Sequence, residues 1–154
     1  MADIDPLVVW NDTLARDIPI TRVMGISAGD YDGNRLKLTA PAAPNLNDKQ
    51  TAFAGSSYSI AAVCGWSLLF VKLLEREIDA DIAVYKGEIN YIKPAVGDFY
   101  AVCVSPEPEI IEDFFAGLAN RQKARITLDT VVYDAKGPVV NFTGRYAVRM
   151  TTLL

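Results

Sequence analysis

The sequence contains no histidine, and this absence excludes a large part of enzyme chemistry. Serine and cysteine hydrolases that rely on a histidine base are ruled out, and so are metal sites built on imidazole ligands. Any catalysis must therefore use carboxylates, amides, hydroxyls, lysines and backbone N–H groups.

Cysteine is scarce as well. The two cysteines, Cys64 and Cys103, lie far apart in the sequence and each has apolar neighbours. Two such residues make neither a thiolate zinc site nor a disulfide framework, so we expect no metal, no bound cofactor and a reducing compartment. Cys64 is expected to be a buried structural thiol. Residues 1–10 carry acids where an export signal needs positive charge, which favours a cytoplasmic location.

Positive charge is not in excess either. The chain has 15 Lys and Arg against 19 Asp and Glu, a net charge of -4, so we expect no nucleic-acid partner. It shows no internal repeat, low-complexity segment or linker. Its 154 residues fit a single domain, residues 1–154, with a core of its own.

One long apolar stretch dominates what is present. Residues 50–71 contain no charge and are flanked by Lys49 and Lys72. A stretch of this length is either a membrane span or a helix enclosed by its own protein. Its glycines and serines, and the absence of a second such stretch, favour the enclosed helix, running on to about Ile78. We therefore expect no membrane span.

The other segments favour an antiparallel sheet. Alternating apolar residues, with Gly, Asp and Pro turns between them, predict strands, and Gly87 predicts a bulge or bend within one of them. A short helix capped by Asp5 is expected over 6–16, and a short helix or loop over 110–118. The expected strands cover residues 22–27, 35–39, 81–93, 99–105, 123–133 and 139–149. This order predicts an α+β fold in which a curved antiparallel sheet of about six strands wraps around one long central helix.

This arrangement resembles the hotdog fold of acyl-CoA thioesterases and dehydratases. The loop and helix start, residues 45–59 (NLNDKQTAFAGSSYS), are similar to a narrower family. That family is the thioesterase-like domain at the C-terminus of some bacterial GNAT-type acetyltransferases, the YiiD C-terminal type. The resemblance covers residues 22–150. It implies an acyl-CoA or acyl-carrier-protein thioester as partner, with coenzyme A or phosphopantetheine as part of the substrate. A homodimer or dimer of dimers is also expected, because pairing is the usual way to protect an open sheet edge.

The phenylacetate-pathway thioesterases, a wider hotdog group, give a stricter comparison. Their pattern is a loop Asn, then His-Gly-Gly, then an acid nine residues after that His. Asn47 matches the Asn, residues 53–55 replace His-Gly-Gly with Phe-Ala-Gly, and the acid position falls on Ala62. Residues 91–95 resemble the turn that closes the third strand of that group. The usual catalytic carboxylate is therefore absent, and a dehydratase is disfavoured because its chemistry in this fold depends on histidine.

The start of the long helix is the expected site of chemistry. The first backbone N–H groups of a helix have no partner within it, so those near Ala54 and Gly55 are candidates to hold the oxyanion of thioester hydrolysis. Gly55 alternatively permits close packing of helix on sheet. Asn47 is a candidate to hold the carbonyl or the water, and Asp48 to contact substrate. Both residues are alternatively helix caps.

The remaining candidates surround that point. Thr51 and Phe53, in the same segment, are candidates to contact substrate, and Ser56, Ser57 and Tyr58 are candidates to orient water. In the family comparison the third strand approaches the helix start across a dimer.

The approach of the third strand to the helix start makes Glu88, which shares a strand face with Lys86, the candidate general base. The alternative for Glu88 is an exposed residue paired with Lys86. Arg121, Lys123 and Arg125 form the local basic cluster, which is either a phosphate contact or a solvated face. The sequence predicts a thioester hydrolase with direct water attack, and the alternative is a non-catalytic acyl-thioester binding protein.

Overall fold

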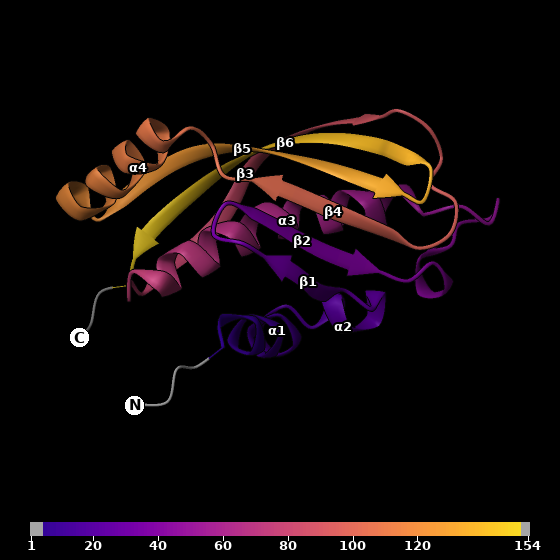
Figure 1. The fold of residues 1–154 in the computed structure, drawn as a ribbon, viewed down its shortest axis with the longest axis horizontal. Helices are drawn as coiled ribbons and strands as arrows, with labels where there is room; N and C mark the ends of the chain where they lie inside the picture. Colours follow the sequence, from indigo (N-terminus) through magenta and orange to yellow (C-terminus); the bar gives the residue numbers. More distant parts are fainter. Residues whose placement is uncertain (1–4, 152–154) are drawn as a thin grey trace.

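A computed structural model describes residues 5–151, and Figure 1 shows its elements. The first helix, α1 (Pro6–Asp17), begins at the predicted cap, where the Asp5 carboxylate accepts a 2.9 Å hydrogen bond from the Leu7 N–H. The strand predicted over 22–27 is wrong for most of its length, because a second helix, α2 (Ile20–Met24), occupies that stretch. The Thr21 hydroxyl donates to carbonyls in and just after α1, and Gly25 ends the turn in the left-handed region at φ 72°.

One six-stranded sheet follows. Its strands are β1 (Ser27–Tyr31), β2 (Arg35–Ala40), β3 (Ala80–Tyr91), β4 (Phe99–Val104), β5 (Lys123–Asp134) and β6 (Gly137–Met150). Their order across the sheet is β1-β2-β4-β5-β6-β3, and every neighbouring pair is antiparallel. The 12-residue strand β3 therefore has an unpaired edge in the described part of the chain. The predicted α+β fold is confirmed.

The long helix α3 (Ala54–Glu75) lies inside the curve of the sheet (Figure 1). It has the length and composition of a membrane span, but 61% of that stretch is buried within the protein, as in a core helix. The helix is shorter than predicted at both ends. Residues 50–53 belong to a loop, and beyond Glu75 the Ile78 N–H turns back to the Leu73 carbonyl.

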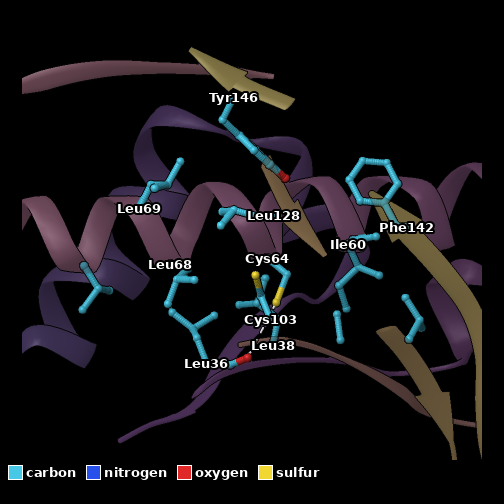
Figure 2. Packing of buried hydrophobic residues seen from close by; sticks show 14 of the residues in the cluster. Leu36, Leu38, Ile60, Cys64, Leu68, Leu69, Cys103, Leu128, Phe142 and Tyr146 are labelled. Atoms are coloured by element: carbon cyan, nitrogen blue, oxygen red, sulfur yellow. Dashed lines mark hydrogen bonds between the residues drawn. The ribbon is translucent and has the colours of Figure 1, made fainter. Parts of the chain in front are cut away.

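The core is built on the sheet-facing side of α3, as Figure 2 shows. The fully buried Tyr146 points from β6 at the middle of the helix and donates a 2.7 Å hydrogen bond to the Ala62 carbonyl. Its ring fits because residue 65 is glycine: a Cβ there would overlap the Tyr146 hydroxyl and lie 2.6 Å from its Cζ. Gly65 thus sets how closely helix and sheet approach.

Strand β3 departs from the prediction in one detail. The irregularity lies between Val84 and Lys86, rather than at Gly87. Gly87 instead faces α3, where a Cβ would overlap the Tyr58 hydroxyl and lie 2.9 Å from the Phe142 ring. The glycine makes room for side chains from the helix and from β6.

The segment predicted as a short helix or loop is a 14-residue helix, α4 (Pro108–Arg121). Its buried face, which includes Ile111, Phe114 and Leu118, packs mainly on β5. The Arg76 guanidinium, just after α3, lies 3.7 Å above the Phe115 ring. This contact ties α4 to the C-terminal end of the central helix.

The two thiols lie within this core, close together in Figure 2. Burial raises the pKa of Cys64, and it raises the pKa of Cys103 to about 12. We predict that in native protein at pH 8 both react with Ellman's reagent at least about a hundredfold more slowly than in guanidinium, because reaction requires the core to open. Spectrophotometric titration measures this. A fast thiol in native protein would contradict the burial of both side chains.

Candidate functional site

The site begins with the loop that leads into α3. The buried Asn45 anchors it: its amide nitrogen donates to the Met24 carbonyl at 2.7 Å and to the Pro41 carbonyl at 2.9 Å. Its own carbonyl accepts the Phe53 N–H at 2.7 Å. These bonds fix the position at which the helix starts relative to α2.

Asn47 organises the next turn of this loop. Its amide nitrogen donates to the Thr51 hydroxyl at 2.8 Å, and its side-chain oxygen accepts the N–H groups of Lys49 and Thr51. Asp48 is exposed and pairs with Lys49 at 3.3 Å. The alternative interpretation of Asn47 and Asp48 as helix caps is wrong, since the N-cap of α3 is Phe53 and no side chain caps it.

The start of α3 is therefore open. The N–H groups of Ser56 and Ser57 both reach the Phe53 carbonyl, whereas those of Ala54 and Gly55 meet no acceptor among the described residues. The Phe53 side chain, 55% exposed, lies over Gly55, where a Cβ would overlap its ring. Gly55 therefore accommodates Phe53, and the close helix–sheet packing suggested for it occurs at Gly65.

A cavity of about 360 Å³ adjoins this open end. Asn47, Thr51, Ala54 and Ser57 line it from the loop and the first turn of the helix. Lys49 from the loop also lines it, as do Tyr91 and Lys93 from the end of β3 and beyond. No aspartate, glutamate or cysteine of the described residues lines it. The cavity thus offers hydrogen-bond donors and positive charge, and no carboxylate among residues 5–151 lines it as a general base.

Tyr91 closes the cavity on the β3 side. Its hydroxyl donates to the Ala54 carbonyl at 2.9 Å, and burial, then the neighbouring Tyr58, raises its pKa. Sequence reasoning singled out residues 91–95 as a family-like turn but did not place Tyr91 or Lys93 in the site. The structure adds them, because β3 runs antiparallel to α3 and ends where the helix starts.

The turn after β3 is held by Asp134. Its carboxylate accepts the N–H of Val96 at 3.1 Å and that of Lys136 at 2.9 Å. Burial alone would raise the pKa of this carboxyl, but these N–H donors outweigh burial and lower it. Asp134 thus stabilises the turn that presents Lys93.

Several other predicted site residues lie outside this cavity. Ser56 is buried without lining the cavity, and Tyr58 packs edge-on against Phe142 with ring centroids 5.1 Å apart. Lys86 and Glu88 lie on the outer face of the sheet, opposite to Gly87, and pair with each other at 3.8 Å. Within one protomer Glu88 therefore faces away from α3.

Arg121, Lys123 and Arg125 lie at the far end of β3 from the helix start. They line a second pocket, of about 740 Å³, together with Arg149. The structure thus brings this predicted cluster together and adds one member from β6. Among residues 5–151 no group of His, Cys, Asp or Glu side chains is placed to hold a metal ion.

A curved antiparallel sheet around one long helix defines the hotdog fold, and solved structures share it. A protein of unknown function from Chlorobaculum tepidum TLS is 35% identical, with a TM-score of 0.89 and 94% of each chain covered. A "putative thioesterase" from Shewanella oneidensis is 25% identical, with a TM-score of 0.83, covering 92% of this chain and 96% of that one. A "Probable Thioesterase" from Pseudomonas aeruginosa is 20% identical, with a TM-score of 0.79, covering 94% of this chain and 95% of that one, and shows the fold alone.

The family follows from the sequence match. The family model described as "Putative thioesterase (yiiD_Cterm)" matches residues 9–150, so the chain belongs to this family. The resemblance based on residues 45–59 is thereby confirmed.

Proposed function

We propose that the protein hydrolyses acyl thioesters of coenzyme A or of acyl carrier protein, and that water attacks the thioester directly. The observation that carries this proposal is the uncapped start of α3: the Ala54 and Gly55 N–H groups meet no acceptor within residues 5–151, and Ala54 lines a cavity. Two aligned backbone donors at the positive end of a 22-residue helix suit the oxyanion that forms during hydrolysis.

The residues around the helix start have distinct roles in this proposal. The thioester carbonyl accepts from Ala54 and Gly55, and Ser57 and Tyr91 border the position of the attacking water. Asn47 is a positioning residue, since its amide is engaged in holding the loop against Thr51. Lys49 and Lys93 add positive potential that favours the developing negative charge.

The base is proposed to come from a second protomer. Within residues 5–151 no carboxylate of the same protomer lines the cavity, and the edge of β3 that is unpaired there offers a surface for pairing two copies. Glu88 lies on that strand but on its outer face, so it would activate the water only in a dimer in which that face meets the partner's cavity.

A panel assay tests the activity. Purified protein is incubated with acyl-CoAs and acyl carrier proteins of several chain lengths, and the released thiol is followed. Turnover above buffer supports the proposal. Binding without turnover on every substrate would establish the second candidate, a non-catalytic acyl-thioester binding protein. The specific observation in favour of that candidate is the cavity's lack of any carboxylate or imidazole.

We predict that Glu88→Ala lowers kcat by about 10²- to 10⁴-fold, which is the usual contribution of a general base. Lys86→Ala is the matched control. It removes the ion-pair partner on the same exposed face, and its activity should stay within about threefold of the wild type, since exposed pairs contribute little. Steady-state kinetics on the best substrate measures both variants. Full activity in Glu88→Ala would remove that residue from the mechanism.

A further inference from the structure

The basic pocket, formed by Arg121, Lys123, Arg125 and Arg149, is unusual for an acidic protein. The chain carries a net charge of -4, yet four cations surround one pocket of about 740 Å³. Asp81 is the single acidic residue that lines it. None of the four cations takes part in an ion pair within residues 5–151. The pocket therefore has an uncompensated surplus of positive charge.

One of these cations is placed where folding alone would not favour it. Lys123 on β5 lies directly opposite Arg149 on β6 in the antiparallel register, and like charges opposite each other in a sheet are destabilising. Arg149 is also directly opposite Asp81 on β3, which offsets its charge, whereas Lys123 has no such partner. Arg121 lies in the last turn of α4, where a cation is favoured by the helix dipole. The position of Lys123 thus favours an anionic ligand as its explanation.

An aromatic ring accompanies the charges. Tyr85 is the residue at the register irregularity between Val84 and Lys86, and it is 48% exposed. The Arg125 guanidinium lies 4.8 Å from the centre of its ring. Aromatic side chains beside arginine are surfaces on which nucleic-acid bases stack. Phosphate-binding cations next to such a ring suit a phosphorylated nucleoside.

We propose that the basic pocket binds the nucleotide part of coenzyme A, with its 3′-phosphate and 5′-diphosphate on the four cations and its adenine against Tyr85. This inference rests on the proposed thioester hydrolysis, and it selects coenzyme A over the carrier protein, whose arm carries a single phosphodiester and no base. Several phosphate charges match four cations better than one does.

The distance between the two sites is compatible with one substrate spanning both. Tyr85, against which the adenine is placed, lies six residues of β3 from Tyr91 at the cavity, roughly 20 Å. The pantetheine arm is about as long as six residues of extended chain, roughly 20 Å.

Binding of adenosine 3′,5′-bisphosphate to the purified protein tests the pocket. Calorimetry on the wild type should show binding that weakens as salt is raised. The Lys123→Ala/Arg149→Ala variant should bind at least about tenfold more weakly, since two charge-assisted contacts are lost. Its melting temperature should stay close to that of the wild type, because the change removes both the Lys123–Arg149 repulsion and the Asp81–Arg149 attraction. Arg22→Ala, an exposed cation on α2, is the control and should bind as the wild type does. Equal affinity in the wild type and the pocket variant would overturn the proposal.

Substrate truncation separates this inference from the proposed function. If the protein hydrolyses thioesters, the pocket variant should raise KM for an acyl-CoA but leave KM for the matching acyl-pantetheine unchanged, because the truncated substrate lacks the nucleotide. An equal rise in KM for both substrates would overturn the inference while hydrolysis stands. Bisphosphate binding without any turnover would overturn hydrolysis while the pocket stands.

Discussion

Replacing Ala54 by proline should remove most of the hydrolytic activity while leaving the protein as stable as before. Ala54 is the first residue of α3, and its N–H is one of the two donors proposed for the oxyanion. Proline lacks that N–H and is favoured at the first position of a helix. The preceding residue, Phe53, has φ −59° and ψ 135°, which a following proline accepts. The side chain of Ala54 is exposed, so the ring has room.

The expected loss in kcat is about 10²- to 10³-fold, the usual cost of removing one oxyanion donor. Ala54→Ser is the matched control, because it changes the side chain and keeps the N–H. Single-turnover kinetics, together with a thermal melt of each variant, measures the effect. Unchanged kcat in a folded Ala54→Pro protein would exclude the helix start as the oxyanion site.

The largest expected effect on stability is that of Gly65→Ala. In an exposed helix this change would stabilise by about 1 kcal/mol through helix propensity. Here the added Cβ meets the buried Tyr146 ring, whose Cζ would lie at 2.6 Å. Tyr146 is fixed by its hydrogen bond to the Ala62 carbonyl and cannot withdraw without disturbing the core. Overpacking of this kind costs about 1–3 kcal/mol, so we expect a net loss of stability.

A second substitution tests that explanation. Tyr146→Phe removes the hydroxyl and should cost about 1 kcal/mol on its own. Combined with Gly65→Ala, it should recover part of the loss, because the overlap with the hydroxyl disappears. Urea unfolding of the four proteins measures the coupling free energy. Strictly additive losses would show that the contact with Tyr146 is not what limits residue 65.

Residues 22–27 form a short apolar run before a Gly/Asp turn, which is typical of a hairpin strand, yet Ile20–Met24 is helical, since the Thr21 hydroxyl and Gly25 complete a turn against α1. Short apolar runs fit either element, and tertiary contacts decide between them. The helix start was predicted three to four residues too early for a similar reason. Residues 50–53 are apolar enough for a helix, but the Asn47 side chain holds Thr51 in the loop.

The candidate site was likewise predicted only in part from the sequence. Asn47, Ala54 and Ser57 were predicted around the helix start and do line one cavity, whereas Gly55 does not line it. Tyr91, Lys93 and Arg149 were not predicted, because each lies on a distant strand or turn. Sequence spacing does not show which strand ends meet a helix start, since this depends on strand order across the sheet.

The sequence by itself determined the class of fold and the kind of chemistry that is excluded. Uncharged residues 50–71 and the alternating strands require a helix enclosed by a sheet, and the absence of histidine removes the commonest catalytic bases. Only the tertiary structure decided that Glu88 faces away from α3, that the helix start is uncapped, and that four cations converge at the far end of β3. Local periodicity governs which residues become buried. The register and order of strands, set by packing across the whole sheet, govern which exposed residues meet.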